Sequence, residues 1–300
     1  MKKQIYNQVG LAILIIFASI INVKPVEAKP MVSAEQAILI DQESGIILYE
    51  KNADNPQLIA SITKVMTAII AIEHGNLKDK VKISQEAVLA EGSSIYLIEN
   101  EWMSLEDLLY GLMLRSGNDA AIAIAEHIGG SVEGFVYLMN EKATWLGLEQ
   151  SSFANPHGLD AEDHYSTSKD IARLMRYAME NAIFAEINQT KTYLSESRTY
   201  HWHNKNKLLT NYYQYTIGGK TGYTKAAGRT LVSVAEKDET QLIAVTINDP
   251  NDWFDHMRLY EWGFEQAKQL DLVTHAEMND LDQPTFFESV FYYLKKMVGL

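Results

Sequence analysis

Strand-like segments lie near both ends of this chain, and helix-like segments fill the part between them. Two short apolar runs on either side of Asp41-Gln42-Glu43-Ser44 predict a β-hairpin, at residues 36–40 and 45–49. Three β-rich runs follow much later, at residues 217–224, 230–236 and 241–247. We expect such a chain to close one antiparallel sheet from both ends, with a helical lobe inserted between the two halves. The predicted fold class is therefore α/β (α+β): an antiparallel sheet flanked by helices, with a helical lobe.

Helical patterns fill the region between these strands. Residues 61–74 carry an apolar stripe and are followed by Gly75, which favours a helix that stops there. Ser104 precedes Leu105-Glu106-Asp107 and resembles the N-cap of a helix that runs through Leu114. Similar patterns predict further helices at residues 120–128, 131–145, 166–179 and, beyond the strands, 253–268.

The first residues of the chain have the pattern of a leader for export. Lys2 and Lys3 precede an apolar run at residues 9–21, and Val26-Glu27-Ala28 offers a cleavage site. The run is too short and wrongly flanked for a membrane span, so we expect a signal peptide over residues 1–28 that is cut after Ala28. A retained N-terminal anchor is the alternative. The signal peptide predicts a secreted protein.

The charge and the cysteine count exclude several classes of protein. The formal net charge is −13 at pH 7. An acidic protein does not attract the phosphate backbone, so we expect no nucleic-acid partner. The chain has no cysteine, which excludes disulfides, thiolate metal sites and a cysteine nucleophile. The chain is long enough to be held together by its apolar core alone.

The pattern Ser61-Ile62-Thr63-Lys64, at the start of a predicted helix, is the first of three that carry chemistry. Residues three apart lie on one face of a helix, so the hydroxyl of Ser61 and the amine of Lys64 can meet. A serine hydroxyl needs a base to take its proton, and a lysine can be that base when burial or another cation lowers its pKa. Taken alone, the pattern also fits an N-cap serine and a solvated lysine.

Two further patterns lie far away along the chain. Ser116-Gly117-Asn118 falls between two predicted helices, where it either projects a hydroxyl and an amide into a cleft or forms an ordinary turn. Lys220-Thr221-Gly222 lies inside the first late strand, directly after two other glycines. Glycine within a strand often marks a close approach of a ligand or of another backbone. A second cation near Lys64 would also keep that amine neutral.

Together and in this order, the three patterns resemble the penicillin-binding and serine β-lactamase superfamily, whose signatures are S-x-x-K, S-x-N and K-T-G. Further stretches are similar to the low-molecular-weight D-alanyl-D-alanine carboxypeptidases, at residues 60–68, 108–126, 155–160, 165–167 and 219–228. The resemblance covers roughly residues 37–268. It implies a serine β-lactamase/transpeptidase-like fold.

The resemblance implies a role for each residue of the first two patterns. Ser61 would be the nucleophile that attacks the carbonyl between two D-alanines, and Lys64 would accept its proton. Ser116 would help to pass a proton to the departing amine. Asn118 would hydrogen-bond the substrate and steady Lys64.

The third pattern is assigned to substrate binding by the same resemblance. Lys220 and Thr221, next to Gly222, would meet the terminal carboxylate of a peptide or of a penicillin. The backbone N–H groups of Ser61 and Tyr223 would form the oxyanion hole. The implied substrate is a peptidoglycan stem peptide, the implied covalent inhibitors are β-lactams, and the implied location is the cell-wall side of the membrane. No metal or organic cofactor is implied.

Two other residues, Lys205 and His157, are candidates for the same site, and a third, Arg258, is left unassigned. Lys205 falls where relatives often carry an arginine near the carboxylate, so it is either a further carboxylate ligand or a solvated charge. His157 lies in the family-like loop at residues 155–160, where a structural hydrogen bond is the preferred interpretation. Some relatives place a further arginine after the last strands, and Arg258 is not assigned to that position.

Two groups of ring side chains are interpreted as structural. His201 and His203 would share one face of a strand, but no third ligand is evident, so we expect surface histidines and no metal site. Trp102 and Tyr212, Tyr213 and Tyr215 either line a substrate groove or pack in the core or a loop cluster, and packing is preferred.

Residues 286–300 carry an apolar stripe with Lys295 and Lys296 off it. This segment is too short to span a bilayer, so it either lies in the membrane surface as an amphipathic helix or docks on the protein itself. The residues after Lys268 are too few for the β-rich second domain of many relatives. We expect a signal peptide at 1–28, a D,D-peptidase catalytic domain at 29–268 and a C-terminal tail at 269–300.

Three other functions are compatible with these motifs. A class A β-lactamase needs a glutamate on a loop after the second motif, and residues 150–159 contain none. A D,D-endopeptidase that cuts cross-links is not distinguished from a carboxypeptidase by the sequence. A catalytically inactive wall-binding or β-lactam-sensing protein is disfavoured by the intact Ser61, Lys64 and Lys220. The sequence therefore predicts a secreted serine D,D-carboxypeptidase.

Overall fold

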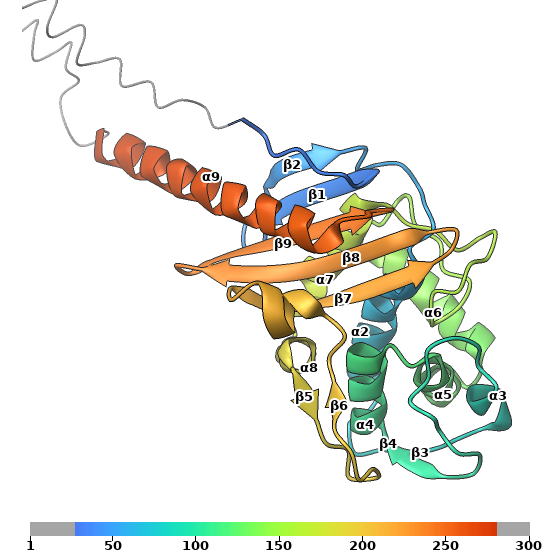
Figure 1. Ribbon diagram of the computed structural model, residues 1–300. Coiled ribbons are helices and arrows are strands. Elements are labelled where there is room, and N and C mark those ends of the chain that lie inside the picture. Colours follow the sequence, from blue (N-terminus) through green and yellow to red (C-terminus); the bar gives the residue numbers. More distant parts are fainter. Residues whose placement is uncertain (1–27, 281–300) are drawn as a thin grey trace, which may run out of the picture. The chain divides into compact units, whose positions relative to one another are not determined.

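A five-stranded antiparallel sheet, in the order β2-β1-β9-β8-β7, forms the centre of the structure (Figure 1). The structure is a computed structural model that describes residues 28–280, with side chains up to residue 268. The strands are β1 (Gln36–Asp41), β2 (Ile47–Lys51), β7 (Thr216–Thr224), β8 (Gly228–Lys237) and β9 (Thr240–Ile247). Because β1 pairs with β9, the sheet is closed from both ends of the chain, and the predicted fold class is confirmed.

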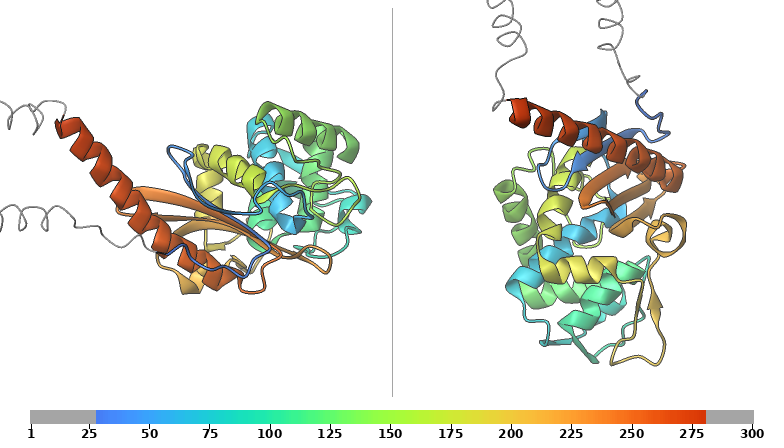
Figure 2. Two further views of the ribbon diagram at one scale, coloured as in Figure 1. Left: turned by 90° about the horizontal axis from the view of Figure 1, so that it is seen from above. Right: turned by 90° about the vertical axis from the view of Figure 1, so that its left-hand side faces the viewer.

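Different helices cover the two faces of this sheet (Figures 1 and 2). The helix α9 (Asp252–Asp280) packs on one face, where Tyr260 and Phe264 join Leu39 of β1 in one apolar cluster. Against the other face lie α7 (Ser168–Met179) and α8 (Ala182–Gln189), and α2 (Lys64–His74) packs against both of these helices. On that side Ile38 and Ile40 join the larger core, since successive strand residues point to opposite faces.

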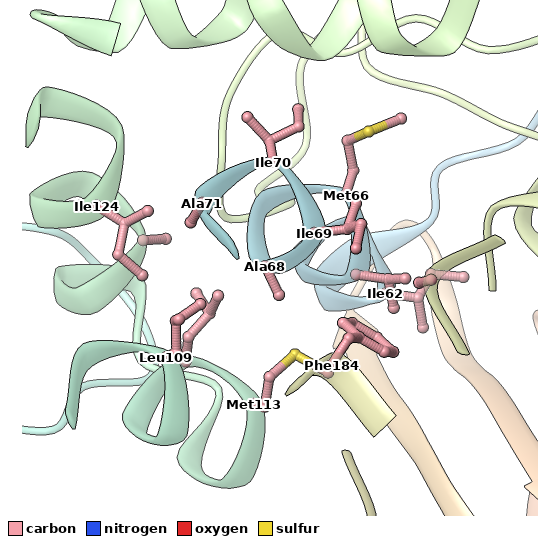
Figure 3. Close-up of a cluster of buried hydrophobic side chains, with 14 of the residues drawn as sticks. Ile62, Met66, Ala68, Ile69, Ile70, Ala71, Leu109, Met113, Ile124 and Phe184 are labelled. Atoms are coloured by element: carbon pink, nitrogen blue, oxygen red, sulfur yellow. The ribbon is translucent and has the colours of Figure 1, made fainter. Parts of the chain in front are cut away.

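The helix α2 is the centre of the larger core. Every residue from Lys64 to Ile72 is buried, as expected for a helix that is apolar nearly all the way round. Figure 3 shows α2 surrounded by side chains from other helices, among them Leu109, Ile124 and Phe184. Its N-terminal end, which carries the Ser61 pattern, is therefore held by packing on several sides.

The remaining elements form the helical lobe and the edge beside β7. They are the 3₁₀ turn η1 (Ala60–Thr63), α3 (Gln85–Val88), α4 (Leu105–Tyr110), the π-helical turn η2 (Gly111–Arg115), α5 (Asn118–Gly129), α6 (Val132–Trp145) and the π-helical turn η3 (Leu208–Tyr212). Two small antiparallel pairs accompany them, β3 (Lys80–Lys82) with β4 (Trp102–Ser104) and β5 (Thr192–Tyr193) with β6 (Trp202–His203).

Several element bounds differ from the sequence-based expectation for local reasons. The second hairpin strand starts at Ile47 because Asp41 holds the turn: its side chain accepts the Ser44 N–H at 2.7 Å and its carbonyl accepts the Gly45 N–H at 2.9 Å. The helix expected from residue 166 starts at Ser168, since the Thr167 side chain caps it by accepting the Asp170 N–H. The helix expected through Leu114 changes to a π-helical turn at Gly111.

Two of the predicted segments lie outside the described residues, namely nearly all of the signal peptide at 1–28 and the amphipathic stripe at 286–300. The helix expected at 253–268 is α9, which starts one residue earlier and continues to Asp280. Within residues 28–280, no helix combines the length and the apolar character that a membrane crossing requires.

Replacing Phe184 with Ala tests the packing beneath α2. The phenyl ring is fully buried, so its removal leaves a cavity, and we expect the free energy of unfolding to fall by about 3–5 kcal/mol. The neighbouring Ile183 is 38% exposed, and Ile183→Ala should change stability by only about 0.5 kcal/mol. Urea denaturation of both variants measures the difference. Equal effects would contradict the assigned packing.

Candidate active site

The structure brings the three motifs together at the N-terminal end of α2. Ser61 lies in η1, and Lys64 is the first residue of α2. The Lys64 Nζ atom lies 3.0 Å from the Ser61 Oγ atom, although α-helical geometry begins only at Lys64. The turn is tight, because Ala60 has a positive φ of 48°. It is braced by Gly158, where a Cβ atom would lie 2.0 Å from the Ala60 carbonyl oxygen.

Two carbonyl oxygens fix the orientation of the Lys64 amine. Its Nζ atom donates to the Asn118 Oδ1 atom at 2.7 Å and to the His157 backbone oxygen at 2.6 Å. A neutral amine has two N–H groups and one lone pair, so these two acceptors use both of its donors. The lone pair is then left for the remaining neighbour, the Ser61 hydroxyl. This arrangement suits a base that takes the serine proton.

The second lysine is arranged around the serine of the second motif. Ser116 follows η2 in the left-handed conformation, with φ of 63°. The Lys220 Nζ atom donates to the Ser116 Oγ atom at 3.0 Å and to the Thr221 backbone oxygen at 2.7 Å. The π-helical turn was not predicted, yet it determines where the helix ends and therefore where Ser116 lies.

Glycine allows β7 to approach Ser61 closely. A Cβ atom on Gly222 would lie 2.8 Å from the Ser61 backbone nitrogen and 2.4 Å from the Thr230 Oγ1 atom. Any side chain at this position would therefore push the strand away from Ser61. The next residue, Tyr223, keeps its side chain in solvent, with 67% of it exposed. The predicted close approach of another backbone at this strand is confirmed.

Burial and neighbouring positive charges lower the pKa of both buried lysines. Burial lowers the Lys64 pKa well below its usual value, and the nearby Lys220 and Lys205 lower it further. Burial, followed by the effect of Lys205, lowers the pKa of Lys220 to about 7. Among the described residues, none of the three amines forms an ion pair with a carboxylate. The site therefore favours the uncharged amine of Lys64, as a proton acceptor requires.

Lys205 lies at the edge of this group. Its backbone N–H donates to the Leu114 carbonyl at 3.1 Å, and its Nζ atom donates to the Ser93 Oγ atom at 3.2 Å. Burial and the charge of Arg115 lower its pKa. The side chain is close enough to the two buried lysines to influence both of them, so it is more than an isolated surface charge.

His164 was missed by the sequence analysis, although it supports the turn that carries Ser61. Its Nδ1 atom accepts the Ala154 N–H at 3.0 Å, so the neutral ring carries its proton on Nε2, which lies 2.7 Å from the Thr63 Oγ1 atom. Thr63 in turn donates to the Ala60 carbonyl at 2.8 Å. Burial, and then the charge of Lys64, lower the His164 pKa to about 4. Thr63 and His164 are too far apart in sequence for a short motif to reveal the contact.

The other candidates lie away from the reacting groups or act through the backbone. His157 contributes its carbonyl to Lys64, while its Nδ1 atom accepts the Leu159 N–H at 3.2 Å. Arg258 lies on α9, where its guanidinium donates to the Met31 carbonyl at 3.4 Å. It belongs to none of the three motifs. His201 and His203 are exposed. No group of three or more His, Cys, Asp or Glu side chains in the described part of the chain could hold a metal ion.

The aromatic candidates are divided between packing and the surface. Tyr213 stacks on Tyr260 of α9 at a centroid distance of 5.7 Å, and Tyr215 packs edge-on against Phe264. Both therefore belong to the packing between the sheet and α9, as preferred from the sequence. Trp102 is 59% exposed on β4.

Replacing Lys205 with Gln tests the electrostatic coupling of the three amines. Removal of a positive charge favours protonation of its neighbours, so the pKa of Lys220 should rise from about 7 towards the free value of about 10.4. The rise should be partial, because burial is the larger cause. NMR titration of the lysine Cε signals measures it. Lys207→Gln, an exposed change on the same segment, should leave the Lys220 pKa unchanged. An unshifted pKa in Lys205→Gln would refute the coupling.

Comparison with known proteins gives one consistent family. The profile of Peptidase_S11, described as D-alanyl-D-alanine carboxypeptidase, matches residues 23–251. D-alanyl-D-alanine carboxypeptidase DacF of Bacillus subtilis is 39% identical over 71% of this chain and 56% of its own length. DacA of Haemophilus influenzae, of the same description, is 34% identical over 78% of this chain and 63% of its own. This chain thus spans less than two thirds of either relative.

A solved structure supports the same assignment. The crystal structure of D-alanyl-D-alanine carboxypeptidase from Mycobacterium tuberculosis H37Rv is 31% identical. The superposition has a TM-score of 0.76 and covers 81% of this chain and 96% of the chain in that crystal structure. The fold, the three motifs and the family profile therefore agree, and this chain belongs to the D-alanyl-D-alanine carboxypeptidase family, Peptidase_S11.

Proposed function

We propose that this protein removes the terminal D-alanine from peptidoglycan stem pentapeptides through an acyl-enzyme on Ser61. The observation that carries the proposal is the Lys64 amine, which lies 3.0 Å from the Ser61 hydroxyl and donates both of its N–H groups to carbonyl oxygens. Burial and the nearby Lys220 and Lys205 lower its pKa well below the usual value, which favours the uncharged form. Such an amine is a competent general base for a serine nucleophile.

The first half of the reaction forms an ester and releases D-alanine. The Ser61 Oγ atom attacks the carbonyl carbon between the two D-alanines while its proton passes to Lys64. The backbone N–H groups of Ser61 and Tyr223 stabilise the oxyanion, and each such donor typically contributes about 3 kcal/mol. The carbon–nitrogen bond then breaks, and Ser116 donates its proton to the departing nitrogen. Lys64, which holds the proton from Ser61, restores that of Ser116.

The carboxylate of the terminal D-alanine is bound by Lys220 and Thr221, with Lys205 as a further cation. Lys220 uses two donors on Ser116 and on the Thr221 carbonyl, so a protonated amine has a third donor for the substrate. An approaching carboxylate raises the Lys220 pKa above its value of about 7 in the free protein, because an opposite charge favours the charged form. Asn118 orients Lys64 through its side-chain oxygen and hydrogen-bonds the substrate.

The second half of the reaction hydrolyses the ester. Lys64 takes a proton from the water that attacks the ester carbonyl. The bond to the Ser61 oxygen then breaks, Lys64 returns the proton to that oxygen, and the shortened peptide leaves with a new carboxylate. Penicillin would acylate Ser61 in the same way and leave slowly. The loop over residues 150–159 has no glutamate to activate a water and instead supplies the His157 carbonyl to Lys64.

The same proposal places residues 29–268 as the catalytic domain of a secreted protein, on the cell-wall side of the membrane. The acidic chain, the export leader and the cell-wall substrate are mutually consistent. Within the tail at 269–300, the stripe at residues 286–300 would make peripheral contact with the membrane surface.

A fluorescent penicillin tests the acyl-enzyme. We expect a stable label on the wild type, no label on Ser61→Ala, and normal labelling of Ser44→Ala, a change in an exposed turn. The label should follow Ser61 because its hydroxyl lies 3.0 Å from the Lys64 amine, the proposed proton acceptor. An unlabelled wild type would support an inactive wall-binding protein, and rapid loss of the label with hydrolysed penicillin would support a β-lactamase.

A comparison of two substrates tests the peptidase activity itself. We expect the wild type to release D-alanine from a pentapeptide faster than it cleaves a cross-linked dimer, and Ser61→Ala to do neither. Mass spectrometry of the products measures both reactions. Faster cleavage of the dimer would favour an endopeptidase.

A further inference from the structure

Two glycines, Gly218 and Gly219, directly precede Lys220 in β7, and the steps above give them no role. Their place in the sheet is irregular, because the pairing of β7 with β8 shifts between Thr216 and Gly218. β7 is the last strand of the described sheet, and β8 lies along one of its edges. The buried backbone groups on the other edge therefore need partners from outside the sheet.

One side chain of α8, that of Asn188, meets both glycines. Its Oδ1 atom accepts the Gly219 N–H at 3.0 Å. A Cβ atom on Gly218 would collide with the Asn188 Nδ2 atom, so the amide can reach the strand only because this position has no side chain. The Nδ2 atom donates to the Met179 sulfur at 3.3 Å, which orients the amide. Asn188 is 1% exposed, so the contact with the strand is shielded from water.

The helix α8 also contacts the two elements that carry the second lysine and its partner. It packs against β7, which provides Lys220, and against η2, which directly precedes Ser116. In Figure 1, α8 lies below β7. The Lys220 Nζ atom lies 3.0 Å from the Ser116 Oγ atom, and this contact depends on how far β7 lies from η2. Because α8 lies against both elements, its hydrogen bond to the strand helps to set that distance.

We propose that Asn188 is a positioning residue, which acts through the Gly219 N–H to hold Lys220 within reach of Ser116 and of the substrate carboxylate. The inference rests on the proposed function and adds a residue to it. Without the Asn188 oxygen, the buried N–H is left unpaired, and the strand can pair it again only by moving. A displacement of about 1 Å is enough to slow an enzyme reaction by about a hundredfold.

Two variants that lack the acceptor test the proposal. Asn188→Leu keeps a side chain of similar size and Asn188→Ala leaves space, so the two differ in packing but not in hydrogen bonding. We expect both to lower kcat/KM for D-alanine release by about ten- to a hundredfold. The Lys220 pKa should rise above its value of about 7, because a strand that moves away exposes the amine to water. NMR titration of the lysine Cε signals measures the pKa. An unchanged rate or an unchanged Lys220 pKa would overturn the proposal.

A variant that keeps the acceptor separates positioning from packing. Asn188→Asp retains an oxygen for the Gly219 N–H, so it should release D-alanine at close to the wild-type rate. A loss as large as that of Asn188→Leu would assign the effect to packing and contradict the role of the hydrogen bond.

Thr246→Val is the control for stability. The Thr246 Oγ1 atom lies 3.0 Å from the His256 Nε2 atom, so this change also removes a buried hydrogen bond, but one between β9 and α9. We expect it to destabilise the protein and to leave the rate and the Lys220 pKa unchanged. Changes as large as those of Asn188→Leu would mean that lost stability alone moves Lys220, against the proposal. Failure of the proposed function is a different result, namely a wild type that neither releases D-alanine nor forms a label on Ser61.

Discussion

An uncharged amine enclosed by the protein is the constraint on which the site depends. An ammonium group at the position of Lys64 would have to give up its hydration without a carboxylate partner, which is costly. Burial and two neighbouring cations favour the neutral form, and two carbonyl oxygens orient the amine. An amine held in this way is suited to the role of proton acceptor that we propose for Lys64.

Three parts of the chain must be correctly placed for this condition to hold. The helix α2 provides the lysine, the start of α5 provides the Asn118 oxygen, and the loop with His157 provides the second oxygen. Strand β7 adds Lys220 and can lie against Ser61 because Gly222 has no side chain. The buried helix α2 and the five-stranded sheet hold these parts at fixed distances, so the rigidity of the core serves the chemistry at its edge.

The sequence was sufficient for the parts of the fold that rest on side-chain pattern. The strands at both ends, the central helix and the three motifs each have a local signature in residue type or period. The π-helical turn before Ser116 and the small pair β5–β6 have none, and η2 and β6 lie in contact although they are far apart in the sequence. The contact of Lys64 with the His157 carbonyl could not be predicted either, since any residue offers a backbone oxygen. His164 was missed because its partner, Thr63, is a hundred positions away.

The pairing of β1 with β9 has a consequence for the order of folding. The two strands are separated by roughly 200 residues of chain, so the central sheet cannot form until almost the whole polypeptide is available. Before that point β1 can pair only with its hairpin partner, and an isolated two-stranded hairpin is marginally stable in water. We therefore expect the complete five-stranded sheet to form late, once β9 is available, and the arrangement of β7 against Ser61 to become fixed only at that step.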